Sequence, residues 1–360
     1  MKRILGLLLT AIMLCACTSC TADEPLIAET SSPTETAAEA PTVSAERAAA
    51  LTEMIDDYGF EGVIYAVENG SPLLSYASGT LENGDTITID SPMPIGSVSK
   101  QFCAAAILLL RDEGKLSLSN TLDVYFPDYA EGQRITIHNL LSMRAGIPEM
   151  TLEGNEDLVT VDHTEEQNIA AILNWLYQQP LTFEPDERFA YTNLNYFMLC
   201  LIVQQVSGMK YIDFLRENFF DPLGMTHTGS IIELADDPDW AQGLTYRQVD
   251  LQPGLTNGCG DLISNAADMT VWIRALSGAK VISAESYRAM TADYSPEDGY
   301  GYGMFTDIAG GVGHYGAIGI YSSFDYINEE KDFSLFLCSN TIYPLAAQGL
   351  ADDLLEILMD

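Results

Sequence analysis

The pattern of apolar and polar positions changes its period twice along the chain. Near residue 62, and again after Gly299, it has the period of two that is typical of strands. The predicted strands are 62–67, 73–77, 300–306, 311–326 and 333–338. The turn residues Asn69-Gly70-Ser71-Pro72 separate the first two strands, which are therefore expected to form a hairpin.

Helical patterns fill the middle of the chain and also occur near both of its ends. The predicted helices cover 45–58, 136–143, 165–178, 194–206, 211–220, 265–276 and 345–359, with a further one that begins near Ser97. This order predicts an α+β fold, in which one antiparallel sheet is formed from both chain ends and flanked by helices. A mostly helical subdomain is inserted between the strands. We place the sheet subdomain at about 45–96 and 295–360 and the helical subdomain at about 97–294.

The first 44 residues have the composition of a targeting segment followed by a tether. Lys2-Arg3 precede a short apolar run that ends in Leu14-Cys15-Ala16-Cys17, which resembles a bacterial lipobox. We therefore expect residues 1–16 to be a lipoprotein signal peptide and Cys17 to be lipidated, although an ordinary export signal is the alternative and Cys20 a weaker acceptor. Residues 17–44 are rich in Thr, Ser, Glu and Pro and predict a disordered tether. The protein is expected to be exported and held by its lipid on the outer side of a bacterial cytoplasmic membrane, or to be periplasmic or secreted.

Composition excludes some classes of function. The formal net charge is −36, from 16 basic and 52 acidic residues, so the surface repels phosphate backbones and nucleic-acid binding is not expected. Cys103, Cys200 and Cys338 lie in apolar runs, and the four histidines are scattered along the chain. Neither a disulfide framework nor a metal site is therefore predicted.

The strongest chemical signal is Ser97-Val98-Ser99-Lys100, which opens a run that is apolar on every side and therefore predicts a buried helix. Lys100 stands where a capping box would have Glu or Gln, and a cation at a helix N-terminus is unfavourable. Because Ser97 and Lys100 lie one turn apart on the same face, they fit a serine nucleophile beside a lysine that accepts or shuttles its proton. A capping serine with a surface lysine is the structural alternative.

The S-x-x-K spacing alone is weak evidence, because the chain contains it twice more. Ser207-Gly208-Met209-Lys210 and Ser277-Gly278-Ala279-Lys280 each follow an apolar helical pattern, and the glycine after the serine predicts that the helix ends there. In these two copies the serine and the lysine need not share a face.

A series of motifs resembles the serine β-lactamase/penicillin-binding-protein-like superfamily, in the branch similar to class C β-lactamases, DD-peptidases and related esterases. The resemblance covers roughly residues 45–360. The motifs are Ile95-Gly96-Ser97-Val98-Ser99-Lys100-Gln101-Phe102, Gly114-Lys115-Leu116-Ser117-Leu118, Ile135-Thr136-Ile137-His138-Asn139-Leu140-Leu141, Gly146-Ile147-Pro148, Tyr191-Thr192-Asn193-Leu194-Asn195-Tyr196 and Asp221-Pro222-Leu223-Gly224-Met225. Their order along the chain is that of the family, and S-x-x-K is its first motif.

The resemblance implies two further motifs. Tyr191-Thr192-Asn193 matches the family's Y-x-N, and Tyr326-Ile327-Asn328 matches only in letters, because it runs from a strand into a charged turn. A phenol near an ammonium ionises more readily, so Tyr191 is expected to take the proton of Ser97, and Asn193 to bind a substrate amide. An aromatic that packs on the next helix is the alternative role for Tyr191.

Two triplets compete for the third motif, K-T-G or H-x-G on a strand that lines the site. His227-Thr228-Gly229 follows a helix-terminating turn, whereas His314-Tyr315-Gly316 lies in a glycine-rich strand, so we choose His314, with a histidine merely at a strand edge as the alternative. Gly316 is expected to let substrate approach the backbone. Many β-lactamases and DD-peptidases have Lys here, and an unperturbed His is mostly neutral at pH 7. His314 is therefore expected to be a hydrogen-bond partner of Tyr191 or of substrate, which favours esters or amides over carboxylate-bearing β-lactams.

Together these features imply acyl transfer without a metal or an organic cofactor. Ser97 attacks a carbonyl, Lys100 and Tyr191 move its proton, and by analogy the backbone N–H groups of Ser97 and Ala317 form the oxyanion hole. The expected substrate is a small molecule or peptide: a cell-wall-like peptide, an ester or a β-lactam. A weakly catalytic or non-catalytic penicillin- or peptidoglycan-binding lipoprotein is the main alternative. A purely structural lipoprotein leaves Lys100 unexplained, and a Ser-His-Asp hydrolase lacks a G-x-S-x-G elbow.

Overall fold

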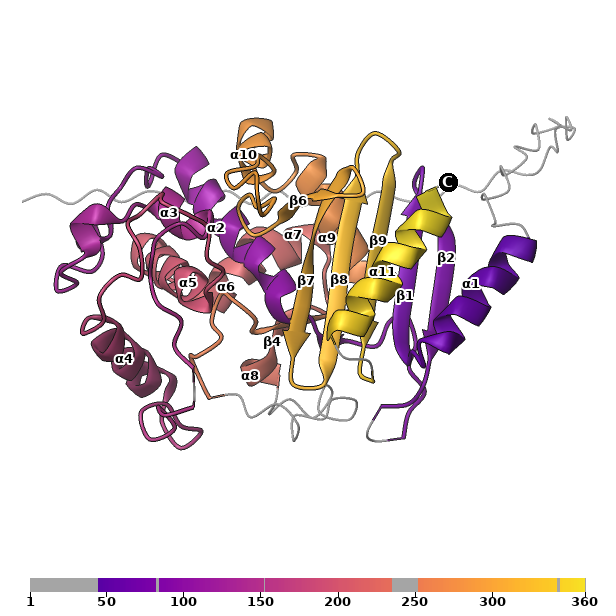
Figure 1. Ribbon diagram of the computed structural model, residues 1–360, viewed down its shortest axis with the longest axis horizontal. Coiled ribbons are helices and arrows are strands. Elements are labelled where there is room, and N and C mark those ends of the chain that lie inside the picture. The colour runs from indigo at the N-terminus through magenta and orange to yellow at the C-terminus, as the bar shows by residue number, and fades with distance from the viewer. Residues whose placement is uncertain (1–44, 82–83, 152, 235–251, 342–343, 360) are drawn as a thin grey trace, which may run out of the picture. The chain divides into compact units, whose positions relative to one another are not determined.

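The computed structural model describes residues 45–81, 84–151, 153–234, 252–341 and 344–359 (Figure 1). The predicted signal peptide, Cys17 and the tether lie outside the described residues and stay predictions. Within the described part, no helix combines the length and the apolar character that crossing a membrane requires.

Strands from both ends of the chain meet in one sheet, which confirms the predicted α+β fold (Figure 1). Within the described residues this antiparallel sheet has six strands in the order β2-β1-β9-β8-β7-β6. The strands are β1 (Gly62–Glu68), β2 (Ser71–Ser78), β6 (Phe305–Ile308), β7 (Gly311–Ile318), β8 (Tyr321–Asn328) and β9 (Phe333–Ser339). The early hairpin joins the late strands where β1 pairs with β9, for example Val63 with Cys338.

Alternation along the strands divides the core between the two faces of the sheet. Ile64 and Leu337 pack with α1 (Ala45–Asp57) and α11 (Pro344–Met359) in one apolar cluster. Their neighbours Val63 and Cys338 belong to the other cluster, with α2 (Lys100–Asp112) and α9 (Ala266–Ser277). The sheet is therefore covered on both faces, and helix α2, which begins at Lys100, belongs to the larger core.

The middle of the chain is mostly helical, as expected. Its helices are α3 (Ile137–Leu141), α4 (Glu165–Leu176), α5 (Asn193–Ser207), α6 (Tyr211–Leu215), a π-helical turn (Arg216–Phe220), α7 (Asp221–Leu223), α8 (Ile231–Leu234) and α10 (Ala284–Met290), with short 3₁₀ turns at Leu122–Val124 and Gly132–Arg134. Short strands β3 (Met93–Pro94), β4 (Gly229–Ser230) and β5 (Leu262–Ser264) pair in the order β3-β5-β4. Capping boxes at Thr136 and Thr164 fix the starts of α3 and α4. The subdomain boundaries stay a prediction.

Two strand predictions near the C-terminus were wrong. Residues 311–326 form two strands, β7 and β8, because the chain reverses at Gly319, which has φ +56°. The strand predicted at 300–306 is displaced to Phe305–Ile308. Gly301 and Gly303 instead pack against other elements, since a Cβ would lie 2.3 Å from the Met290 carbonyl oxygen and 2.8 Å from that of Lys100, respectively.

Candidate active site

The buried side chain of Lys100 is the centre of the candidate site. Its Nζ donates hydrogen bonds to Ser97 Oγ (2.9 Å), to Asn193 Oδ1 (2.9 Å) and to the Cys259 carbonyl oxygen (2.7 Å). An ammonium has three N–H donors, so these three acceptors match the protonated lysine. Lys100 is 0% exposed. The lysine is therefore held inside the protein, which excludes the surface-lysine alternative.

Ser97 lies in a 3₁₀ turn, η1 (Gly96–Ser99), directly before α2, so the predicted helix begins three residues later than Ser97. The turn presses against β7. Gly96 has φ +49°, and a Cβ there would lie 2.7 Å from the Ala317 backbone nitrogen. At Gly316 a Cβ would lie 2.1 Å from the Ile95 carbonyl oxygen. Gly316 lines the pocket that contains Ser97, and the expectation that it admits substrate stays a prediction. Its missing side chain also admits the protein's own backbone, and this brings Ala317 next to Ser97.

Tyr191 and Asn193 reach the site from the loop before α5 and from its first residue. The Lys100 Nζ lies 4.9 Å from the centroid of the Tyr191 ring, within the range of a cation–π contact. Tyr191 is 36% exposed, whereas the helix behind it is buried. The structure therefore brings together Ser97, Lys100, Tyr191 and Asn193, with Tyr191 and Asn193 open to solvent and Lys100 buried.

His314 is the third-motif residue that the structure brings to Ser97. Its Nδ1 lies 2.6 Å from the Tyr315 carbonyl oxygen, which can only accept, so Nδ1 carries the hydrogen. Its Nε2 then accepts from the Tyr300 hydroxyl at 3.3 Å. Burial, followed by the charge of Lys100, lowers the pKa of His314 to about 3, so the ring is neutral at pH 7. The expected partner Tyr191 is replaced by Tyr300, and the Tyr191 ring centroid lies 6.0 Å from that of His314.

The competing motifs have other positions. The His227 backbone N–H donates to Asp268 Oδ2 at 2.7 Å, in the loop before β4, and His227 does not line the pocket that contains Ser97. Tyr326 is buried in β8, where its hydroxyl donates to the Ala309 carbonyl oxygen. Neither residue contributes to the Lys100 centre.

A model of the Beta-lactamase family matches residues 47–358. The chain belongs to the beta-lactamase family. It is 29% identical over 289 residues to a protein named as a penicillin-binding protein, PbpX of Bacillus subtilis (strain 168), covering 77% of this chain and 69% of that one. It is 27% identical to a D-aminopeptidase of Brucella anthropi, covering 71% of this chain and 51% of the relative.

Solved structures share this fold. The D-amino acid amidase of Ochrobactrum anthropi SV3, solved in complex with L-phenylalanine, superposes with a TM-score of 0.74 at 21% identity. The superposition covers 88% of this chain and 99% of the amidase. It supports the α+β architecture, an antiparallel sheet with helices, that the motifs implied.

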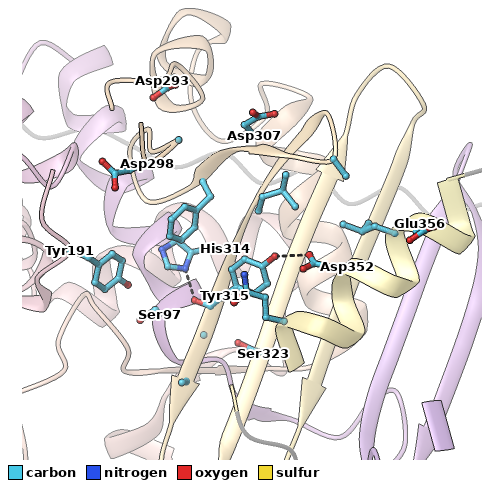
Figure 2. A pocket seen from close by; sticks show the side chains of 18 of the residues that line it. Ser97, Tyr191, Asp293, Asp298, Asp307, His314, Tyr315, Ser323, Asp352 and Glu356 are labelled. Atoms are coloured by element: carbon cyan, nitrogen blue, oxygen red, sulfur yellow. Dashed lines mark hydrogen bonds between the residues drawn. The ribbon is translucent and has the colours of Figure 1, made fainter. Parts of the chain in front are cut away.

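An open pocket of about 1100 Å³ extends from Ser97 along the outer side of β7 to α11 (Figure 2). Tyr191 and His314 face it beside Ser97, and Tyr315 continues its wall toward Asp352 (Figure 2). Carboxylates dominate the charged lining: Asp293, Glu297, Asp298, Asp307, Asp352 and Glu356, beside the single lysine Lys331 among the lining residues. Within the described residues, no group of three or more His, Cys, Asp or Glu side chains could hold a metal ion.

Sequence analysis missed two groups that bear on the site. Glu149 Oε2 accepts from the Asn193 backbone N–H at 2.5 Å, and its Oε1 accepts from Asn193 Nδ2 at 3.2 Å. This orients the amide so that its oxygen faces Lys100. Desolvation raises the pKa of Glu149, opposed by these hydrogen bonds and by the charge of Lys100, although part of the carboxylate is open to solvent. The other group is the Cys259 carbonyl, a backbone acceptor that no side-chain motif reveals.

Proposed function

We propose that this protein is an exported serine hydrolase that forms an acyl-enzyme on Ser97. The observation that carries the proposal is the buried Lys100, whose ammonium bridges Ser97 Oγ, Asn193 Oδ1 and the Cys259 carbonyl oxygen. Burying an ammonium among neutral acceptors lowers the stability of the fold, and a purely structural role does not explain why Lys100 is buried there. A charge in contact with the serine oxygen instead serves the nucleophile.

In the proposed reaction Ser97 Oγ attacks a carbonyl carbon. The Tyr191 oxygen takes the serine proton and gives it to the leaving group, while Lys100 stays protonated and its positive charge stabilises negative charge on Ser97 Oγ and on the Tyr191 oxygen. The backbone N–H groups of Ser97 and Ala317 are proposed to bind the oxyanion, since Gly96 and Gly316 bring the two segments together. Loss of one such donor typically lowers kcat about 10²- to 10³-fold. Water then releases the acyl group.

The charges around Ser97 favour substrates without a carboxylate. His314 is neutral, and the lining of the pocket is dominated by carboxylates, so an anionic substrate meets net repulsion. Glu149, fixed by Asn193 and partly open to solvent, offers an acceptor for a substrate ammonium. The names of two relatives, a D-aminopeptidase and a D-amino acid amidase, suggest the same class. We propose D-amino-acid amides and peptides as the preferred substrates, with esters next and β-lactams last.

The location belongs to the proposal as well. Lys2-Arg3, the apolar run and the lipobox-like Leu14-Cys15-Ala16-Cys17 support export and a lipid anchor at Cys17. The tether of residues 17–44 would then hold the hydrolase on the outer side of the cytoplasmic membrane, within reach of peptide substrates of the cell wall.

Hydrolysis of a substrate panel tests this proposal. Wild type and Ser97→Ala are incubated with D-amino-acid amides, D-amino-acid dipeptides, short-chain esters and a penicillin, and product release is followed. We expect turnover by wild type in the order given and none by Ser97→Ala. Binding of a penicillin or of peptidoglycan fragments without turnover of any substrate would instead support the binding-protein alternative.

A further inference from the structure

Strand β8 holds the segment around Ser97 at both of its ends. Ser323 Oγ donates to the Ile95 carbonyl oxygen at 2.7 Å, two residues before the serine. Gln101 Nε2 donates to both carboxylate oxygens of Asp325 at 2.7 Å, directly after Lys100. Residues two apart on a strand share a face, so these two side chains reach the segment from the same side of β8.

Asp325 also holds β7. Its Oδ1 accepts from the His314 backbone N–H at 2.9 Å, in addition to the two contacts with Gln101. Asp325 and Gln101 are both 0% exposed. One buried carboxylate therefore joins three elements: the start of α2, strand β8 that carries it, and strand β7 at the residue that faces Ser97.

The hydrogen-bond pattern requires a carboxylate at this position. The Trp272 indole, which can only donate, binds Gln101 Oε1 at 3.1 Å and so turns the amide nitrogen of Gln101 toward Asp325. Every partner of the Asp325 side chain is then a donor. An isosteric amide would place its own N–H₂ against that of Gln101, and at least one hydrogen bond would be lost.

We infer that Asp325, together with Ser323, is a positioning residue that holds the Ser97–Lys100 segment against β7. The inference rests on the proposed function. The proposed oxyanion donors, the N–H groups of Ser97 and Ala317, belong to different elements, and their spacing depends on how these elements are fixed. A displacement of about 1 Å in such an arrangement can lower a rate 10²-fold.

The test is a swap of the buried charge. Asp325→Asn loses the contact with Gln101, whereas the double variant Asp325→Asn with Gln101→Glu moves the carboxylate to the helix. In the double variant the introduced asparagine donates to the introduced glutamate, which still accepts from Trp272. Asp268→Asn is the matched control, because Asp268 is also buried and accepts from His227 N and Thr228 Oγ1 but does not line the pocket.

The rate of Ser97 acylation by a fluorophosphonate, kcat and KM for an accepted substrate, and Tm are measured for each variant. We expect Asp325→Asn to lower the acylation rate and kcat about 10- to 100-fold, with little change in KM. If the loss is about 100-fold, the double variant should be at least about tenfold faster than Asp325→Asn. Asp268→Asn should lower Tm without lowering acylation. Ser323→Ala, which removes one hydrogen bond, should show a smaller fall and serves if Asp325→Asn does not fold.

Two results would overturn the inference alone: a folded Asp325→Asn that is acylated at the wild-type rate, or a folded swap variant that is no faster than Asp325→Asn. If Asp325→Asn does not fold, an unchanged rate for Ser323→Ala would overturn it. If wild type itself is never acylated, the proposed function is refuted. The two results above, in contrast, refute only the positioning role of Asp325.

Discussion

The same spacing of serine and lysine has opposite surroundings at the start of α2 and at the end of α5. At the start of α2, Lys100 is buried and bonded to Ser97 Oγ. At the end of α5, the helix stops at Ser207, Gly208 adopts φ +73°, and the exposed Lys210 becomes the N-cap of α6. There the Ser207 hydroxyl accepts from the Met209 backbone N–H instead.

The comparison shows that the position in the fold, and not the S-x-x-K spacing alone, brings the lysine into contact with the serine. The third copy agrees, since α9 ends at Ser277 and Lys280 is exposed. At Lys100, neighbouring elements supply acceptors for the ammonium and bury it, whereas Lys210 and Lys280 are exposed.

Lys100→Met and Lys210→Met test directly whether the buried lysine has a role that the exposed lysine lacks. Loss of Lys100 removes the donor to Ser97 and the positive charge beside Ser97 and Tyr191, so acylation by a fluorophosphonate should fall about 10²- to 10⁴-fold. Lys210→Met exchanges an exposed side chain and should leave the rate unchanged. Stopped-flow labelling of both proteins, with circular dichroism to confirm folding, decides the matter; equal rates for the two variants would refute a special role for Lys100.

Tyr191→Phe and Tyr196→Phe compare two rings near the same ammonium, with centroids 4.9 and 6.0 Å from Lys100 Nζ. Tyr191 presents its hydroxyl at the pocket, whereas the Tyr196 hydroxyl donates to the Leu141 carbonyl oxygen inside the core. Tyr191→Phe should lower kcat about 10- to 100-fold. Tyr196→Phe should instead cost about 1 kcal/mol of stability with kcat retained. The prediction fails if the loss of kcat falls on Tyr196→Phe.

Glu149→Gln tests whether Glu149 binds the ammonium group of the substrate. It keeps an oxygen acceptor for Asn193 but removes the negative charge, so kcat/KM for a D-amino-acid amide with a free amine should fall about tenfold, or 1.4 kcal/mol. The N-acetylated amide should be affected much less. The matched control is Glu153→Gln on the same loop, for which both substrates should react as with wild type. An equal loss on both substrates would remove the ammonium-binding role.

The smallest expected effect is on stability against pH. Burial raises the pKa of Asp261 to about 7 from the ordinary 3.8, so the folded protein keeps a proton that the unfolded chain releases between about pH 4 and pH 7. This group therefore makes stability fall as pH rises through that window and level off above it. Asp261→Asn should flatten this fall, and each 1 kcal/mol of it corresponds to about 2–4 °C of Tm. A slope unchanged by the variant, measured by calorimetry from pH 4 to pH 8, would contradict the assignment.

The periodicity of apolar residues and the turn residues were sufficient to predict most helices and strands of this fold. The hairpin of β1 and β2, the buried α5 and the closing α11 follow from periodicity and turn residues. Prediction failed where apolar alternation ran through a turn, as at Gly319, whose left-handed conformation leaves no other mark in the sequence. It failed also at Gly301 and Gly303, where close packing on distant elements overrides strand propensity.

The residues of the site could be predicted only where they belong to short sequence motifs. Ser97, Lys100, Tyr191, Asn193 and His314 were chosen from motifs, and the structure places them together. Gln101 and Asp325 are 224 residues apart and look like ordinary polar residues, while the Cys259 carbonyl is backbone that any residue could provide. Such groups become visible only when the elements that carry them are packed together.

Intact mass after treatment with a fluorophosphonate shows directly whether Ser97 is an activated nucleophile. Wild type, Ser97→Ala and Ser207→Ala are treated side by side, and labelled protein is digested to locate the adduct. We predict one adduct on wild type and on Ser207→Ala, located at Ser97, and none on Ser97→Ala. Folded wild type without an adduct, or an adduct that persists in Ser97→Ala, would contradict the claim that the Lys100 centre activates Ser97.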